Sequence, residues 1–230
     1  MEPILQHPWN ISEEKAINLQ TELAQKVIKN DKLSPIQYVA GVDVAYSKNS
    51  DTLIAAIVIL ELNSLKVVES VTIQDSVKFP YIPGLFSFRE LPPILKAFEK
   101  IKTIPQLIVC DGQGIAHPRR FGLASHLGVI YDIPTIGCGK TKLLGNFIEP
   151  DLYRGAYSPL LDKSEIIGSV LRTQKNIKPI FVSTGHRISL STACDIILKL
   201  TPKYRLPETT RHADQLVKQT MSRLNDSLNE

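Results

Sequence analysis

The chain has 230 residues, of which 43% are hydrophobic and 22% are charged, and its formal net charge is +4. This composition is ordinary for a folded globular protein and excludes a disordered or low-complexity chain. The mild positive charge permits a polyanionic partner without requiring one. No apolar run approaches the ~18 residues needed to cross a bilayer, and the N-terminus lacks a signal-peptide pattern. We therefore expect a cytoplasmic protein without a membrane partner.

The cysteines are odd in number and far apart, at Cys110, Cys138 and Cys194. Their apolar or small-residue surroundings indicate reduced, buried thiols and exclude a disulfide framework or a zinc site. The sequence contains no internal repeat and no stretch with linker composition. We expect residues 1–230 to form a single domain, and we expect a monomer.

The first part of the chain predicts one helix and three strands. Ser12, followed by two glutamates, is typical of a helix start, and an apolar stripe extends the helix to about residue 30. We expect this helix to pack on a sheet. Residues 38–46, 52–62 and 66–74 are β-rich with short polar links, which predicts a meander of antiparallel hairpins. The continuous apolar run in the second segment predicts a strand covered on both faces.

The remaining elements alternate between strands and helices. A proline-rich loop over residues 79–90 leads into a helix near 88–100, whose start is uncertain because Pro92 and Pro93 suit only a first helical turn. The elements expected next are a strand at 107–110, a helix around 121–128, a strand near 135–138, a pair of strands within 153–184, and helices near 189–200 and 210–224. This order predicts an α/β fold with a mixed sheet covered on both faces.

Two carboxylates occupy unusual positions. Asp43 lies within the apolar strand GVDVAY, and Asp111 ends the apolar run LIVC beside glycines that would let a ligand approach the backbone. A buried acid is costly unless it is paired, hydrogen-bonded or bound to metal. The alternatives are an edge-strand Asp43 exposed to solvent and an Asp111 that caps the next helix. Glu90 and Asp214 lie on predicted helices, where surface acids are common.

Taken together, these four acids favour a hard cation. Clustered carboxylates with few soft ligands suit Mg²⁺, with Mn²⁺ able to substitute for it. Such a site activates water and neutralises charge on a phosphate, which is the chemistry of phosphodiester hydrolysis. Acids on a first strand, a helix, a fourth strand and a late helix form a ribonuclease-H-like arrangement.

The chain resembles the endonuclease V family, the deoxyinosine-directed repair nucleases, over nearly its whole length. The motifs that carry the resemblance are GVDVAY, PYIPGLFSFRE, DGQGIAHPRRFGLASHLG, GCGKTKLLG, GAYSPL, STGHRISL and LPETTRHAD. The resemblance implies a ribonuclease-H-like fold, a divalent metal and DNA containing deoxyinosine as substrate. It further implies cleavage of the second phosphodiester on the 3′ side of inosine, leaving 3′-hydroxyl and 5′-phosphate ends.

The resemblance also assigns roles to the acids. It implies that Asp43 and Asp111 are the principal metal ligands and that Glu90 holds metal or orients the water. Asp214 matches a position where relatives carry Asp or His, with His212 as a nearby alternative.

A proline-rich loop matches the family's wedge, formed by Pro80, Tyr81, Ile82, Pro83 and Gly84. Prolines stiffen such a loop, and a tyrosine ring can stack where an extruded base has left the helix. The alternative is a simple turn with the tyrosine folded onto the core.

Lys140, in GCGKT, is not part of a P-loop because Pro134 occupies the position of the required glycine. We expect this lysine to contact a phosphate or the leaving group. Further residues are predicted at a pocket for the flipped base: Gly112, Gly114, Gly137, Gly139, Leu143 and Leu144. Predicted contacts to DNA are Arg89, His117, Arg119, Arg120 and Arg187, although each arginine could be a solvated surface charge and His117 a loop histidine.

Three other functions compete with cleavage of DNA. Inosine-containing RNA is the preference of some family members, and contacts to a 2′-hydroxyl would distinguish it. A non-catalytic lesion-binding protein would have no need of clustered acids, which repel DNA when no metal is bound. A nucleotide-hydrolysing switch is disfavoured by the missing P-loop.

Overall fold

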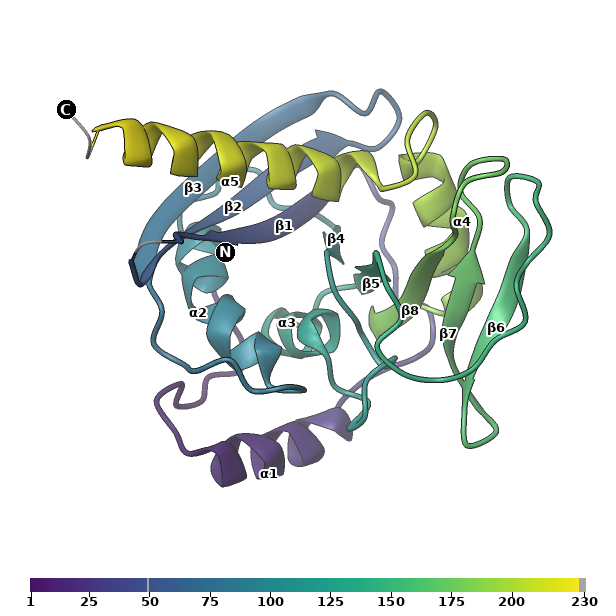
Figure 1. The fold of residues 1–230 in the computed structure, drawn as a ribbon, viewed down its shortest axis with the longest axis horizontal. Helices are drawn as coiled ribbons and strands as arrows, with labels where there is room; N and C mark the ends of the chain where they lie inside the picture. The colour runs from purple at the N-terminus through teal and green to yellow at the C-terminus, as the bar shows by residue number, and fades with distance from the viewer. Residues whose placement is uncertain (49, 228–230) are drawn as a thin grey trace.

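A computed structural model describes residues 1–48 and 50–227 of the chain. Within these residues the strands form one eight-stranded sheet of order β3-β2-β1-β4-β5-β8-β7-β6 (Figure 1). The strands are β1 (Tyr38–Tyr46), β2 (Thr52–Glu61), β3 (Val67–Ser76), β4 (Leu107–Cys110), β5 (Thr135–Gly139), β6 (Tyr157–Asp162), β7 (Glu165–Leu171) and β8 (Ile180–His186). The β1–β4–β5 pairs are parallel and the other pairs are antiparallel, so the sheet is mixed, as predicted.

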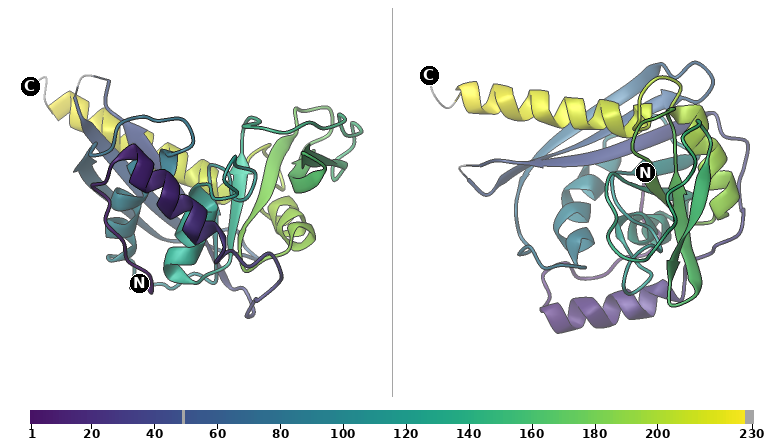
Figure 2. Two further views of the ribbon diagram at one scale, coloured as in Figure 1. Left: turned by 90° about the horizontal axis from the view of Figure 1, so that it is seen from below. Right: turned by 45° about the vertical axis from the view of Figure 1, so that its right-hand side comes forward.

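The helices cover both faces of this sheet (Figures 1 and 2). They are α1 (Glu13–Ala24), α2 (Phe86–Phe98), α3 (Leu123–Tyr131), α4 (Leu190–Leu200) and α5 (Glu208–Ser227). Side chains of β2 alternate between the two faces of the sheet. Ile54 and Ala56 pack on α5, whereas Leu53 and Ile57 pack in the core with α2. The prediction that this strand is covered on both faces is therefore confirmed. None of the described helices is long and apolar enough to pass through a membrane.

Helix α1 differs from the prediction in its end and in its packing. It ends at Ala24 because the backbone of Ile28 is bonded to the end of β8: its N–H donates to His186 Nδ1 (3.2 Å) and its carbonyl accepts from the Arg187 N–H (2.6 Å). Leu23 packs with α3 and the residues just before it. The helix thus packs mainly on α3 and, through Ala16, beside Phe88 of α2, and not on the sheet as predicted (Figure 2).

Two further differences concern α2 and β6. Helix α2 begins at Phe86 and contains Pro92 and Pro93 in its interior, where each proline removes an intrahelical hydrogen bond. Burial of Phe88, Leu91 and other apolar side chains along the helix outweighs this loss.

The segment 153–184 contains three strands where two were predicted. The third, β6, is an edge strand containing Pro159, and only alternate side chains are buried, so its pattern is weak.

Candidate active site

The parallel register of β1 and β4 brings two carboxylates together at the middle of the sheet. Val42 of β1 is paired with Cys110 of β4. The residue that follows each of them is an aspartate, Asp43 and Asp111. Since side chains alternate along a strand, both aspartates point toward the face that α5 covers, opposite to the core side chains of Val42 and Cys110. Asp43 is therefore neither an edge acid nor directed to solvent.

Burial and the negative charge of Asp111 raise the pKa of Asp43 to about 7. The desolvated carboxyl group is penalised when ionised, and a second carboxylate beside it increases this penalty. A positive charge placed between the two aspartates would relieve both effects.

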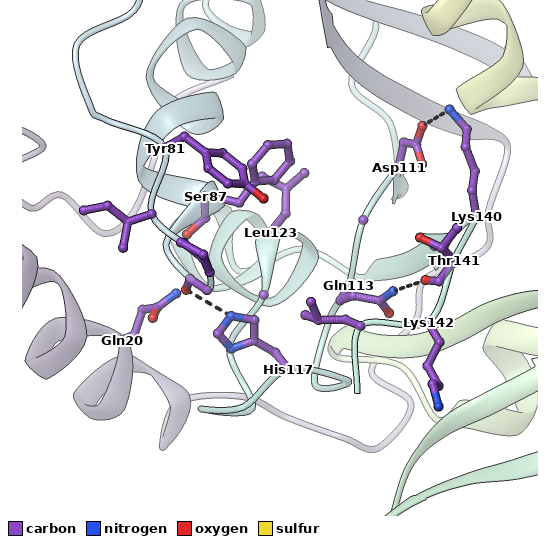
Figure 3. Close-up of a pocket in the computed structure, with 18 residues that line it drawn as sticks. Gln20, Tyr81, Ser87, Asp111, Gln113, His117, Leu123, Lys140, Thr141 and Lys142 are labelled. Atoms are coloured by element: carbon purple, nitrogen blue, oxygen red, sulfur yellow. Dashed lines mark hydrogen bonds and ion pairs between the residues drawn. The ribbon is translucent and has the colours of Figure 1, made fainter. Parts of the chain in front are cut away.

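Lys140 and Asp214 complete this side of the site. Lys140 follows β5, and its Nζ lies 2.5 Å from Asp111 Oδ2 and 3.9 Å from Asp214 Oδ1 (Figure 3 shows the pair with Asp111). Burial works to lower the pKa of Lys140, but the hydrogen bond and charge of Asp111 outweigh it, so the pKa is raised and the ammonium is kept. Asp214, on α5, also pairs with Lys218 (2.7 Å), whereas His212 faces Glu208 (3.6 Å).

Glu90 approaches from the opposite face of the sheet, on α2. Its side chain is buried, and its pKa is raised well above the usual value by that burial and by the charge of Asp43. Tyr46 Oη donates a hydrogen bond to Glu90 Oε1 (3.1 Å). Tyr46 was not singled out from the sequence, although its position three residues after Asp43 in GVDVAY was a usable signal.

The donor set at this site suits a hard divalent cation. Asp43 and Asp111 offer carboxylate oxygens, and the charge of Asp111 raises the pKa of Asp43 even though Lys140 pairs with Asp111. Among the described residues no three His, Cys, Asp or Glu side chains converge as a complete ligand set. Mg²⁺ is commonly held by only one or two carboxylates, with water and substrate phosphates as the other ligands, so the two aspartates fit such an ion.

A cavity of about 390 Å³ opens beside Asp111 and separates two walls (Figure 3). One wall is the wedge, from Tyr81 to Gly84, and the other is the loop from Lys140 to Leu143 that follows β5. Gly112 and Gly139 line it between these walls, together with Leu123. The cavity is partly open to solvent, and Asp111 is the one of the four predicted acids in its lining.

Two of the predicted pocket glycines do not line this cavity. A Cβ at Gly114 would lie 2.0 Å from the Thr184 carbonyl oxygen, and one at Gly137 would lie 2.3 Å from the Gly114 nitrogen. These glycines permit close approach of backbones inside the fold, so the assignment of both to the pocket is corrected. Leu144 also lies outside the lining and packs in a small core cluster near Phe147.

The wedge projects into solvent. Tyr81 is 70% exposed, Pro80 and Pro83 are exposed, and Ile82 is half-buried against the core cluster that includes Ala16 and Phe88. Tyr81 is therefore not folded onto the core. The loop is fixed at its base and free at its aromatic tip.

Residues predicted to contact DNA have structural partners. Arg89 donates to the Phe79 carbonyl (3.2 Å) and stacks over the Tyr46 ring. His117 is buried, and that burial, together with the charge of Arg119, lowers its pKa to about 4, so it is neutral. Its Nδ1 accepts from the Arg119 N–H, so its Nε2 donates to the Gly84 carbonyl (3.0 Å) at the base of the wedge.

The other predicted arginines are also engaged within the fold. Arg120 pairs with Asp162 and Glu165 of the β6–β7 hairpin, both at 2.7 Å. Arg187 pairs with Asp132 after α3. The expectation that these two side chains are free to bind phosphates is not supported by this geometry.

Several residues that line the cavity were not singled out in the sequence, and Gln113 and Gln20 are two of them. Gln113 donates to the Thr141 carbonyl (3.2 Å) and so ties the two glycine-rich loops together, while its Oε1 has no partner among the described residues. Gln20 reaches the cavity from α1. It lies outside every motif, so nothing local in the sequence marks it.

Comparison with known proteins identifies the family. The family profile described as Endonuclease V matches residues 21–215. A protein named Endonuclease V from Trichormus variabilis is 53% identical over 211 residues, which cover 91% of this chain and 96% of that protein. The chain belongs to the endonuclease V family. It is accordingly a nuclease.

Solved endonuclease V structures share the fold. The Streptomyces avermitilis endonuclease V is 46% identical with a TM-score of 0.91, covering 96% of this chain and 98% of its own. The endonuclease V of Ciona intestinalis, 29% identical with a TM-score of 0.81 and coverage of 93% and 100%, was crystallised with a 23mer DNA containing an inosine followed by a ribo-adenosine. These matches confirm the α/β fold predicted from the sequence.

Proposed function

We propose that this chain is a metal-dependent DNA repair endonuclease that acts at deoxyinosine. It hydrolyses the second phosphodiester on the 3′ side of the lesion and leaves 3′-hydroxyl and 5′-phosphate ends. The observation that carries the proposal is that Asp43 and Asp111 lie side by side, each one residue after the paired Val42 and Cys110, and that Asp111 lines a cavity whose far wall includes the exposed Tyr81. The inosine-containing DNA bound to the Ciona intestinalis relative supports the choice of lesion.

Asp43 and Asp111 would hold Mg²⁺, or Mn²⁺ in its place. A bound divalent ion lowers the pKa of water and offsets charge that builds on the phosphate. Asp43 must lose its proton to act as a ligand, and its pKa of about 7 makes this loss easy near neutral pH. Buried Glu90, held by Tyr46, is placed to orient a water molecule through its second oxygen.

Lys140 serves the leaving group. Its ammonium, paired with Asp111 and near Asp214, is positioned to donate a hydrogen bond to a phosphate oxygen next to the acids. When water attacks phosphorus and gives up a proton to the solvent, the P–O3′ bond breaks, and the 3′ oxygen takes a proton from the Lys140 ammonium, which regains one from the solvent. The same lysine also reduces the repulsion between the carboxylates and the nucleic acid.

The cavity and the wedge together would accommodate the lesion. The inosine base enters the cavity between Gly112, Gly139 and Leu143, and the ring of Tyr81 fills the gap left in the base stack. Extrusion of a base costs a few kcal/mol, so a rigid aromatic plug offsets part of that cost. Each of these contacts lies on one chain, so we propose that the protein works as a single-domain monomer.

The test is cleavage of an end-labelled duplex with one deoxyinosine, in Mg²⁺ or in EDTA. Wild type is expected to give a single nick at the second phosphodiester, abolished by EDTA. Asp43→Asn should lower the rate by roughly 10²- to 10³-fold, as loss of a group that stabilises transition-state charge does. Asp195→Asn, an exposed acid on α4, is the matched control and should cut normally.

Two further substrates sharpen this test. One carries a ribo-adenosine 3′ to the inosine, and the other is an inosine-containing RNA. Cleavage of RNA alone would replace DNA repair by RNA processing as the function. Binding of the deoxyinosine duplex with no cleavage of any substrate would overturn the nuclease mechanism proposed for this chain.

A further inference from the structure

The base of the wedge is held by two side chains of one segment that is distant in the sequence. The Gly84 carbonyl oxygen accepts two hydrogen bonds, from Arg119 Nη2 (2.7 Å) and from His117 Nε2 (3.0 Å). Gly84 has a φ of +81°, and a Cβ there would lie 2.7 Å from Arg119 Nη2. Glycine is therefore required both for the turn and for the close approach of the guanidinium.

The guanidinium of Arg119 is itself fixed from helix α1. Its Nε donates to Gln20 Oε1 (2.6 Å), and Gln20 Nε2 donates to the Phe121 carbonyl (3.1 Å). Gln20 is 1% exposed, so both polar ends of its amide are paired inside the fold. No carboxylate of the described residues lies within ion-pair distance of Arg119, and the neutral amide is the group that orients it.

We propose that Gln20 is a positioning residue for base extrusion, acting through Arg119 on the wedge. Gln20, Arg119 and the Gly84 carbonyl form a chain of hydrogen bonds, called here the wedge brace, that sets how far the ring of Tyr81 stands from the acids. Apolar packing of Ile82 beside Ala16 joins the same helix to the same loop. A loop without strand partners needs such support, because only a rigid wedge offsets the cost of opening the duplex.

This inference rests on the proposed function, since it assigns the wedge a part in extruding inosine. It predicts an effect that depends on the substrate. A single-stranded substrate has no base stack to be filled, so the wedge brace should matter for a duplex and hardly at all for a single strand. A residue needed only for folding would affect both substrates equally.

The experiment compares single-turnover cleavage of deoxyinosine in duplex and in single-stranded DNA. Gln20→Leu removes both hydrogen bonds at nearly constant volume, and its duplex rate should fall roughly 10- to 100-fold, as a misplacement of about 1 Å at a positioned site does. Its single-strand rate should stay near that of wild type. Gln20→Glu keeps an acceptor for Arg119 and should retain most of the duplex rate. Gln25→Leu, the same change at an exposed position beside α1, is the matched control.

A double variant tests the coupling to the wedge. Once Tyr81→Ala has removed the ring, adding Gln20→Leu should reduce the duplex rate little further, because the two changes act on one element. Equal duplex rates for wild type and Gln20→Leu, or equal losses on both substrates, would overturn the inference while wild-type cleavage still upheld the proposed function. If Gln20→Leu does not fold, Arg119→Lys, which cannot span both acceptors, carries the same comparison. Failure of wild type to cut either substrate would reject the proposed function first.

Discussion

On one wall of the cavity, Asp111 and Lys140 follow β4 and β5, whose backbones are hydrogen-bonded to neighbouring strands throughout. On the other wall, Tyr81 lies on a loop outside the strands, held by hydrogen bonds to the Gly84 and Ile82 carbonyls and by the half-buried side chain of Ile82. The acids are thus placed by sheet register, which no single side chain controls. The wedge is placed by a few side chains, so it is the part that substitution can move without unfolding the protein.

The largest effect is expected from Gly114→Ala, in the part of the molecule that the strands hold in place. The added Cβ would lie 2.0 Å from a backbone carbonyl oxygen, which cannot move without disturbing β8, so the free energy of unfolding should fall by roughly 3 kcal/mol or more. Urea denaturation measures this change. Gly112→Ala is the control: its Cβ would meet only Leu123, at 3.4 Å, and the variant should fold while its cleavage rate falls because Gly112 lines the cavity. Equal stability of the two variants would contradict the assignment of Gly114 to packing.

On the wall formed by the wedge, Tyr81→Ala should show the opposite behaviour, with stability kept and the cleavage rate reduced. The ring is 70% exposed, so the melting temperature should stay close to that of wild type. The duplex cleavage rate should fall by roughly 10- to 100-fold, because base–aromatic stacking contributes about 1–3 kcal/mol. Tyr81→Phe keeps the flat ring and should cut normally. A loss in Tyr81→Phe as large as that in Tyr81→Ala would show that the hydroxyl, and not stacking, is used.

A third effect, on stability, is expected from pH acting on Asp43. The pKa of this group is about 7 in the folded protein and 3.8 in its ordinary state, so between these values the folded protein holds a proton that the unfolded chain has lost. Its contribution to the free energy of unfolding therefore falls as pH rises from 4 to 7. In EDTA, Asp43→Asn should gain stability relative to wild type over this range. If the difference in free energy of unfolding between the two proteins stayed constant with pH, the aspartate would not be desolvated. In a separate measurement, Mg²⁺ at pH 7 should stabilise wild type more than the variant.

Much of this arrangement could be read from the sequence where it depends on local pattern. An acid in GVDVAY and another after LIVC stand out because neighbouring apolar residues commit those segments to the core. What was missed depends on partners far along the chain. Helix α1 ends early because of His186, and Arg187 is paired with Asp132. Likewise, sequence does not distinguish a glycine that faces a ligand, such as Gly112, from one that faces another backbone, such as Gly114.

The order of the acids along the chain has a consequence for synthesis of the protein. Asp43 and Asp111 are translated early, but Asp214 lies on α5, which also covers the apolar face of β2 through Ala213 and Val217. A chain still being translated therefore has an incomplete acid cluster and an uncovered sheet until its last helix emerges from the ribosome. On the proposed mechanism, a chain that stops before α5 lacks the carboxylate beside Lys140 and leaves the apolar face of β2 exposed to solvent.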